Sequence, residues 1–170
     1  GSGLAGIVVT DICEDSGGKI WIGTIGALNC LAQKTGIIHH FSPDTSDLLS
    51  IDNRILKIHE DNNCILWLIT GGNIFAFNKI TESFIKYPVD STSYRTAIFL
   101  MRRPGQILED SQGRIWIASH DGLYFYNRQE DKFKVFRNIP GNKSSLSANT
   151  LTFLSEDGCG TIWCSTLGGG

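Results

Sequence analysis

The stretch Glu109–Ser119 reads E-D-S-Q-G-R-I-W-I-A-S, and its pattern occurs four times in a chain of 170 residues. Subtracting the residue numbers of the four tryptophans gives spacings of 46, 49 and 47 residues, and every Trp of the chain is used: Trp21, Trp67, Trp116 and Trp163. Self-similarity at a period of about 20 to 50 residues is the mark of a repeat architecture. The fold can therefore be predicted from the repeat alone, before any single residue is considered for a functional role.

Each copy has the same internal register. An acidic pair stands seven and six residues before each Trp: Glu14-Asp15, Glu60-Asp61, Glu109-Asp110 and Glu156-Asp157. Glycine stands three residues before the Trp in three copies, and Cys64 replaces it in the other one. An aspartate that accepts backbone N–H groups, followed by a glycine with positive φ, is typical of a tight turn. We therefore expect the acidic pairs to build turns.

Apolar residues alternate around each Trp, as in Ile20-Trp21-Ile22, which predicts short, half-buried strands. Besides the Trp strand, each repeat is expected to contain a strand that ends at the acidic pair, one such as Leu123 to Asn127, and an aromatic one such as Lys132 to Phe136. Four antiparallel strands per repeat make a propeller blade. The sequence thus predicts an all-β chain that forms a partial β-propeller of about three and a half four-stranded antiparallel blades.

We expect one domain over residues 1–170, with repeats at about 4–49, 50–99 and 100–146 and a half blade at 147–170. Propellers typically have about four to eight blades, so the chain is expected to be a piece of a longer array. Repeat units are stabilised by their neighbours, and open strand edges invite association. Further blades or another copy of the chain are therefore the expected partners at these edges.

The repeat pattern N-x-I-x-x-I-x-E-D-x-x-G-x-I-W-I-G-T-x-x-G-L resembles the two-component regulator propeller repeat. Asn53–Trp67, Ile107–Leu123 and Leu151–Thr166 carry most of the resemblance. It implies a sensor propeller from the extracytoplasmic region of a hybrid two-component regulator, whose ligand is commonly an oligosaccharide. It also implies a periplasmic location and a parent protein that is anchored in the inner membrane. The kinase, phosphorelay and DNA-binding regions of such a parent are not encoded in this chain.

Composition argues against several other classes of partner, namely nucleic acid, membranes, metals and cofactors. The formal net charge of −2 and the pI near 6.1 provide no basic field for nucleic acid or for an anionic membrane. No apolar run approaches the roughly 20 residues that span a bilayer, so membrane contact is expected only through other parts of the parent. The five cysteines include no C-x-x-C pair, so we expect neither a metal site nor a disulfide framework, and no cofactor. Buried structural thiols are the expected role of these cysteines.

Paired carboxylates also occur in glycosidases, which place two acids roughly 5 to 10 Å apart. A catalytic pair has no reason to recur in every blade, however, and no nucleophile motif is present. We therefore expect no catalytic residue and favour a non-catalytic sensing module. Two alternatives stay open: a propeller that mediates protein interaction or dimerisation, and a carbohydrate-active propeller enzyme such as a lyase or glycosidase.

Function is commonly carried by loops on a constrained scaffold, so the segments in which the repeats differ are the candidates. The turns between second and third strands and the connections between blades are expected on one face. The candidate ligand-binding residues in them are Arg54, Asn73, Tyr94, Arg95, His120 and Asp121. Tyr94 could stack on a sugar ring and Arg95 could donate to its acidic group. A solvated loop is the alternative for each candidate, whereas the shared repeat position of Asn53 and Asn149 favours backbone capping.

Overall fold

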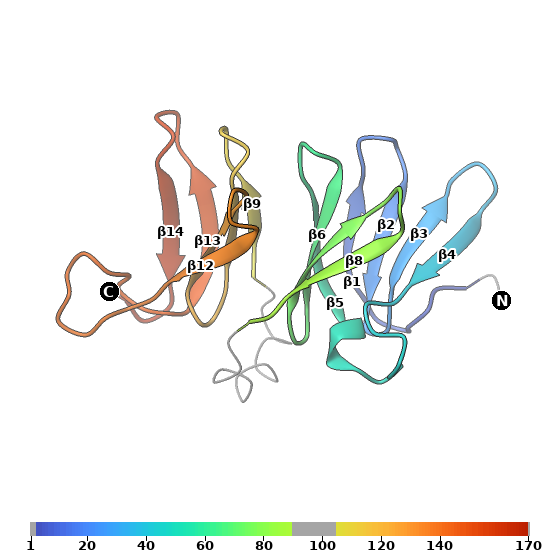
Figure 1. The fold of residues 1–170 in the computed structure, drawn as a ribbon, viewed down its shortest axis with the longest axis horizontal. Coiled ribbons are helices and arrows are strands. Elements are labelled where there is room, and N and C mark those ends of the chain that lie inside the picture. Colours follow the sequence, from blue (N-terminus) through green and yellow to red (C-terminus); the bar gives the residue numbers. More distant parts are fainter. Residues whose placement is uncertain (1–2, 90–104, 170) are drawn as a thin grey trace. The chain divides into compact units, whose positions relative to one another are not determined.

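The computed structural model describes residues 3–89 and 105–169, which form an all-β structure. Fourteen strands build three four-stranded antiparallel sheets and one two-stranded antiparallel sheet (Figure 1). Within the described residues the only helical element is one short 3-10 helix. No helix in these residues is therefore long and apolar enough to cross a membrane. The chain divides into two compact units, Gly1–Met101 and Arg102–Gly170.

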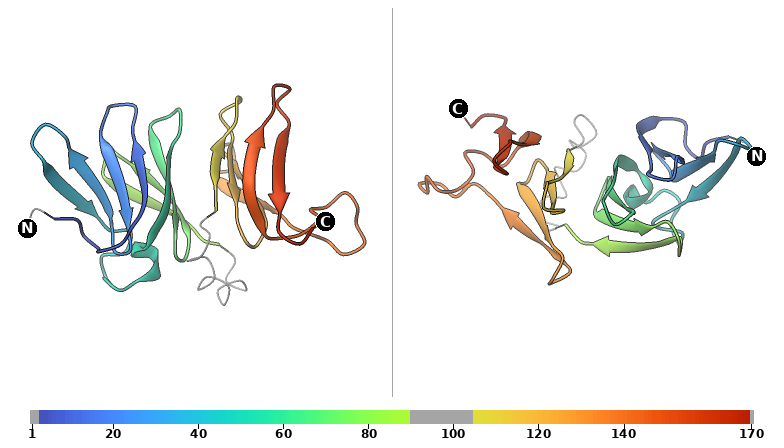
Figure 2. Two further views of the ribbon diagram at one scale, coloured as in Figure 1. Left: turned by 180° about the vertical axis from the view of Figure 1, so that it is seen from behind. Right: turned by 90° about the horizontal axis from the view of Figure 1, so that it is seen from above.

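The first unit contains two sheets in which each strand pairs with its neighbour in the sequence. The first sheet consists of β1 (Val9–Glu14), β2 (Ile20–Thr24), β3 (Leu28–Ala32) and β4 (Ile37–Phe41). The second sheet consists of β5 (Ile55–Glu60), β6 (Ile65–Thr70), β7 (Ile74–Asn78) and β8 (Ser83–Tyr87), and the 3-10 helix η1 (Ile51–Asn53) precedes it. The inner strands β1 and β5 lie side by side (Figure 2). This up-and-down order is that of propeller blades.

Alternation along the strands explains how these two sheets bury each other. Trp21 pairs with Cys13 on β1 and with Cys30 on β3, so the three side chains project from one face of the first sheet. This face packs on Phe77 of the second sheet, whose ring centroid lies 5.6 Å from that of Trp21. The buried core between the sheets comprises Trp21, Leu28, Cys30, Ile55, Ile58, Leu66, Leu68, Phe75 and Phe77.

The aspartate of each acidic pair builds the expected turn and also holds the repeat tryptophan. Asp15 Oδ1 accepts the backbone N–H groups of Gly17 and Lys19, both at 2.9 Å, and Oδ2 accepts the Trp21 indole N–H at 2.8 Å. The same three bonds recur around Asp61, Asp110 and Asp157. One carboxylate therefore fixes both the turn and the position of the ring.

The residue three before each Trp has positive φ, at 78°, 73° and 81° for Gly18, Gly113 and Gly160, and Cys64 adopts the same conformation with φ of 61°. The expectation of buried thiols is wrong for Cys64 and Cys159, which are exposed because both lie in these turns. Cys30 is buried, and Cys13 and Cys164 are half-buried. All five are free thiols.

The glutamate of the acidic pair connects one sheet to the next. Ser16, which follows Asp15, donates its backbone N–H to Glu60 Oε2 at 2.5 Å and its hydroxyl to Glu60 Oε1 at 3.1 Å. Lys79 of the second sheet donates to Asp15 Oδ2 at 3.0 Å and also to Glu60 Oε1. One largely buried ammonium group thus bridges carboxylates from both sheets.

The second unit repeats this construction. Its four-stranded sheet consists of β9 (Ile107–Glu109), β10 (Ile115–Ala118), β11 (Leu123–Asn127) and β12 (Lys132–Phe136), and β13 (Leu151–Glu156) pairs with β14 (Ile162–Thr166). The buried core between the two sheets comprises Ala118, Leu123, Leu151 and Leu154. Ser111 donates its backbone N–H and its hydroxyl to Glu156, both at 2.7 Å, as Ser16 does to Glu60. Three four-stranded sheets and one two-stranded sheet confirm the predicted fold class.

Candidate functional site

The segments that vary between repeats meet at one end of the strands in the first unit. The turn between β2 and β3 touches the connection to β5, because Ile25 forms a backbone bridge with Arg54 and Gly26 donates its N–H to Asn53 O at 3.1 Å. Gly71, in the turn between β6 and β7, donates to Ile51 O at 3.1 Å and to Arg54 O at 2.9 Å. The strands place the acidic turns at their other end. The expected separation of variable and constant loops therefore holds within this unit.

A hydroxyl three residues after the Trp closes each of these variable turns. Thr24, Thr70 and Ser119 donate their side-chain O–H to the carbonyl three residues later, each at 2.9 Å. The sequence has Thr or Ser at this position in every repeat, but it does not reveal the role of the hydroxyl. It fixes the turn, so the residues between the two partners project in a defined direction.

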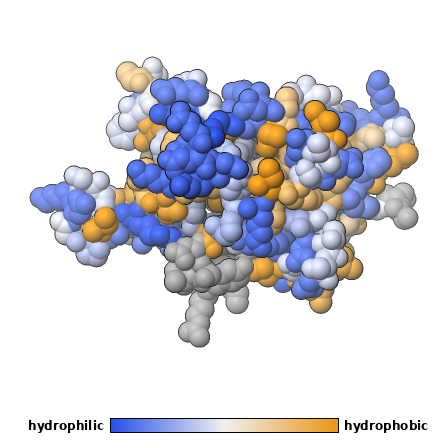
Figure 3. Space-filling model, in the orientation of Figure 1, coloured by the Kyte–Doolittle hydropathy of each residue, from blue (hydrophilic) through white to orange (hydrophobic). Residues whose placement is uncertain are grey.

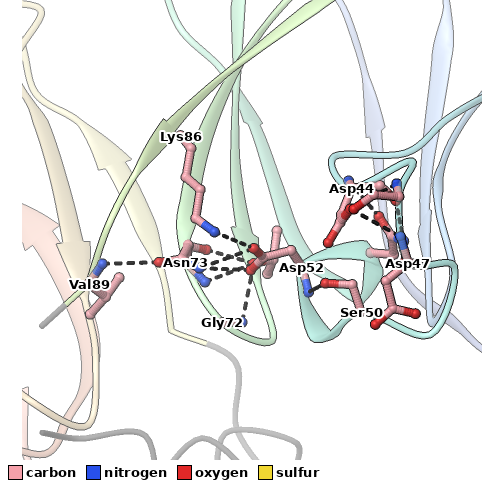
Figure 4. Close-up of polar contacts among 11 residues, drawn as sticks. Asp44, Asp47, Ser50, Asp52, Gly72, Asn73, Lys86 and Val89 are labelled. Carbon is pink, nitrogen blue, oxygen red and sulfur yellow. Dashed lines mark hydrogen bonds and ion pairs between the residues drawn. The ribbon is translucent and has the colours of Figure 1, made fainter. Parts of the chain in front are cut away.

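A buried polar cluster lies where η1 meets the turn between β6 and β7, and Figure 4 shows Lys86 and Asn73 pointing at the carboxylate of Asp52. Asn73 Nδ2 donates to Asp52 Oδ1 at 2.8 Å and to Oδ2 at 3.2 Å. Lys86 Nζ lies 2.7 Å from Asp52 Oδ2, and Thr70 Oγ1 lies 3.3 Å from Oδ1. A buried carboxylate needs such partners, and here three side chains supply them.

Both polar atoms of the Asn73 amide are hydrogen-bonded, because Nδ2 donates to Asp52 and Oδ1 accepts the N–H of Val89 at 3.2 Å. A side chain at the preceding turn position would not fit, because a Cβ on Gly72 would lie 2.6 Å from Asp52 Oδ1. The structure therefore assigns Asn73 a place in the packing of the loop. Whether it also contacts a ligand stays a prediction.

The connection from β4 to η1 is held by Asn53, which is buried. Its Nδ2 donates to the carbonyls of Asp44 and Asp47 at 2.8 and 3.0 Å, and its Oδ1 accepts the Asp44 N–H at 2.9 Å. Asn149 accepts the N–H of Asn138 at 2.6 Å in the second unit. The expectation that this repeat position caps the backbone is confirmed.

Asp44 will titrate with a pKa of about 2, because hydrogen bonds from the Ser46 and Ser50 hydroxyls stabilise its ionised form. Its folded pKa lies below the unfolded value of roughly 3.9, so its contribution to order in the connection is present above about pH 4 and is lost as the pH falls toward 2. Carbon-detected NMR titration of the carboxyl measures this pKa. Ser46→Ala should raise it, whereas Ser83→Ala, whose hydroxyl bonds Thr81, should leave it unchanged.

Arg54 is half-exposed and directly precedes β5 at the same end of the strands. Its backbone N–H and C=O bond to Ile51 and Gly71, so the position of its main chain is fixed. Its guanidinium has no hydrogen bond or ion pair to any residue in the ranges that the structure describes. An anchored backbone with an unpaired cationic head suits binding of an anionic group.

The turn between β10 and β11 holds the two candidates of the second unit, His120 and Asp121. Asp121 accepts hydrogen bonds from the Arg137 guanidinium and from the Tyr124 hydroxyl, the latter at 3.4 Å. Burial, together with the neighbouring Asp121 carboxylate, raises the pKa of Tyr124 to about 12, so the phenol stays a donor. His120 is half-exposed, and its carbonyl accepts from Thr150 at 3.5 Å. The sequence did not predict the contribution of Arg137, which comes from the end of β12.

Arg54 and Asn73 therefore lie near each other in the first unit, and His120 and Asp121 are sequence neighbours in the second. The remaining candidates, Tyr94 and Arg95, lie outside the described residues. In the described part of the chain, no group of three or more His, Cys, Asp or Glu side chains is placed to hold a metal ion.

Comparison with known proteins agrees with this architecture. The family model for the two component regulator propeller matches residues 3–26 and 102–121. No curated protein matches the sequence. The family match and the four repeats in register both agree with the resemblance to two-component regulator propeller repeats.

Solved structures extend the comparison over nearly the whole chain. The extracellular domain of BT3049 from B. thetaiotaomicron, described as a hybrid two-component system, matches with a TM-score of 0.70 and 25% identity over 94% of this chain and 19% of that one. The extracellular domain of BT4673 from the same organism has a TM-score of 0.74 and 18% identity over 96% and 21% of the two chains. PorZ, a surface component of the type-IX secretion system of Porphyromonas gingivalis, has a TM-score of 0.63 and 17% identity over 95% and 24%.

The chain spans about a fifth of the length of these solved chains. At 18% and 17% identity, BT4673 and PorZ support the fold alone. The resemblance to extracellular domains of hybrid two-component systems agrees with the class of protein that the repeats define.

Proposed function

We propose that residues 1–170 form a partial sensor propeller of a hybrid two-component signalling protein and that this region binds an oligosaccharide without changing it. The observation that carries the proposal is the 25% identical match to the extracellular domain of BT3049 over 94% of the chain. A periplasmic location, with the parent anchored in the inner membrane and its kinase region elsewhere, belongs to the same proposal. Further blades of the parent would complete the propeller.

A sensor of this kind needs no chemical step. A ligand that prefers one arrangement of the propeller and its partner shifts the equilibrium toward it by the difference in affinity. The loop end of the first unit offers suitable chemistry, because the Arg54 guanidinium has no partner among the described residues and stands beside backbone that the turn and η1 fix in place. A guanidinium binds a carboxylate through two parallel hydrogen bonds, so a sugar that carries an acidic group is the favoured ligand.

Replacing Arg54 with glutamine should weaken binding of a uronic-acid oligosaccharide by about 10- to 100-fold, because a charge-assisted hydrogen bond contributes roughly 1.5 to 3 kcal/mol. Titration calorimetry of the purified chain measures the affinity. Lys34→Gln removes the same charge at the opposite end of the strands and is the matched control. Equal losses in both variants, or no loss in either, would argue against a ligand contact at Arg54.

A second candidate function, association with another protein, is favoured by large apolar side chains that are exposed on internal loops, namely Leu48, Leu49 and Ile80. On the face seen in Figure 3, hydrophobic residues form separate small patches between hydrophilic ones.

A further inference from the structure

The loop end of the second sheet carries a second cation in the neighbourhood of Arg54. Lys86, near the end of β8, points at the Asp52 carboxylate (Figure 4), and its Nζ lies 2.7 Å from Asp52 Oδ2. Asp52 stands two residues before Arg54, so the Cα atoms of these two residues are at most about 7 Å apart. The two cationic side chains therefore belong to one region of the surface.

The ion pair between Lys86 and Asp52 has its positive group on the solvent side. The Asp52 side chain is 8% exposed, whereas that of Lys86 is 50% exposed. Asn73 and Thr70 also donate to the carboxylate, so protein donors surround it. An approaching anion meets the ammonium group first and the carboxylate at a longer distance, and the Coulomb interaction falls with distance. The pair therefore attracts an anion, although less strongly than a lysine without a carboxylate behind it.

Phe75, directly opposite Lys86 in the pairing of β7 with β8, helps to hold the lysine in position. Lys86 Nζ lies 5.8 Å from the centroid of the Phe75 ring, which is within the range of a cation–π contact. A side chain that is held before a ligand arrives loses less conformational entropy on binding. Lys86 therefore differs from a mobile surface lysine, because its head group is already in place.

The ion pair is peculiar to the second repeat. Subtraction of residue numbers places Asp52 fifteen residues before Trp67 and Lys86 nineteen residues after it. The other repeats have neither an acid at the first of these positions nor a lysine at the second. The residues there are Gly6, Met101 and Ala148 at the Asp52 position and His40 and Val135 at the Lys86 position. A residue that serves the common fold recurs, as the acidic pairs before each Trp do, so this variation favours a role in function.

We propose that Lys86 is a specificity-determining residue of the oligosaccharide site and binds a second acidic group, so that the ligand carries carboxylates on two neighbouring sugars. Lys86 acts here beside Arg54, so its role rests on the proposed function, in which Arg54 binds the first carboxylate. The guanidinium takes one acid through two parallel hydrogen bonds, and the ammonium group takes the other as a point charge. Asp52 holds Lys86 in place and at the same time weakens its attraction for the second acid.

Titration calorimetry of the purified chain with two disaccharides measures the contribution of Lys86. One is digalacturonic acid, and the other has one galacturonic acid joined to a neutral galactose. Wild type should bind the doubly acidic disaccharide about tenfold more tightly, because a hydrogen bond to a charged group contributes to affinity on this scale. Lys86→Gln removes the charge but can still donate to Asp52. Its preference should fall to about twofold, which remains because either acid can occupy Arg54.

Asp52→Asn gives the second, opposite change. It removes the charge that opposes the second acid, so the preference for digalacturonic acid should rise by about threefold. A purely structural role for the ion pair predicts instead that Asp52→Asn loosens η1 and weakens both disaccharides alike. Lys34→Gln, at the opposite end of the strands, is the control and should keep the wild-type preference. Near-UV circular dichroism checks that each variant is folded.

The role of Lys86 and the proposed function fail in different ways. Equal affinity of wild type for the two disaccharides, lost in Arg54→Gln, would overturn the role of Lys86 and leave the proposed function standing. A preference that survives in the folded Lys86→Gln variant would do the same. Binding of neither disaccharide would contradict the acidic ligand proposed for Arg54, and the role of Lys86 with it.

Discussion

Replacing Asp15 with alanine will destabilise the first unit by about 3 to 5 kcal/mol. The substitution leaves the buried Trp21 indole N–H and two turn N–H groups without their acceptor, and it removes one of the two carboxylates that neutralise Lys79. Each buried donor left unsatisfied costs roughly 1 to 3 kcal/mol, and breaking a buried ion pair costs about 3 to 5 kcal/mol, although the two terms overlap here. Urea unfolding followed by tryptophan fluorescence measures the loss.

Asp157→Ala is the matched control, because Asp157 makes the same three bonds in an exposed setting. Water can replace the lost acceptor there, so the loss should be much smaller. Equal losses at the two sites would contradict the view that burial of the Asp–Trp pair, rather than the turn alone, gives the interaction its strength.

Lys79→Met will cost the first unit about 3 to 5 kcal/mol, because two largely buried carboxylates on different sheets would lose their shared cation. The Lys79 side chain is 13% exposed, and those of Asp15 and Glu60 are 3% and 11% exposed. Lys132→Met is the control. Lys132 pairs with Glu130 at 2.8 Å, and both side chains are exposed, so we expect a loss below about 1 kcal/mol. An equal or larger loss for Lys132→Met than for Lys79→Met would contradict the role of burial in this network.

The network of Asp15, Glu60 and Lys79 also makes the stability of the first unit depend on pH. Burial alone would raise the pKa of Asp15 and lower that of Lys79, but hydrogen bonds and opposite charges outweigh burial, so the pKa of Asp15 is lowered and that of Lys79 is raised. The Asp15 contribution is present above roughly pH 4 and is lost as the pH falls through its folded pKa. The Lys79 contribution is present below roughly pH 10 and is lost as the pH rises through its folded pKa. The network should therefore stabilise the unit most between these two pH limits. In the Lys79→Met variant, the free energy of unfolding should depend less on pH on both the acidic and the alkaline side.

The turns and strands could be predicted because their sequence pattern occurs four times in the chain. Alternation around Trp gave the strands, and the spacing of aspartate and glycine gave the turns. The Asp–Trp hydrogen bond was missed, although the constant spacing of six residues was visible. The link from Ser16 to Glu60 was missed because it joins residues 44 positions apart and depends on how neighbouring sheets pack.

Less of the site could be predicted. Variation between repeats directed attention to the correct end of the strands in the first unit, but it could not reveal that Asn73 and Asp121 are bonded to side chains from other strands, Asp52 and Arg137. Such contacts arise from tertiary packing and leave no local pattern in the sequence. Arg54 differs because its guanidinium is unpaired within the described residues, which only the structure could establish.

The most direct measurement is calorimetric titration of the purified chain with neutral and uronic-acid oligosaccharides, followed by chromatography of the recovered sugar. The account predicts saturable binding of an acidic oligosaccharide that is recovered unchanged. Recovery of cleaved sugar would identify a carbohydrate-active enzyme instead. Absence of binding, both by this chain and by the extracellular region of its parent, would contradict the sensor function.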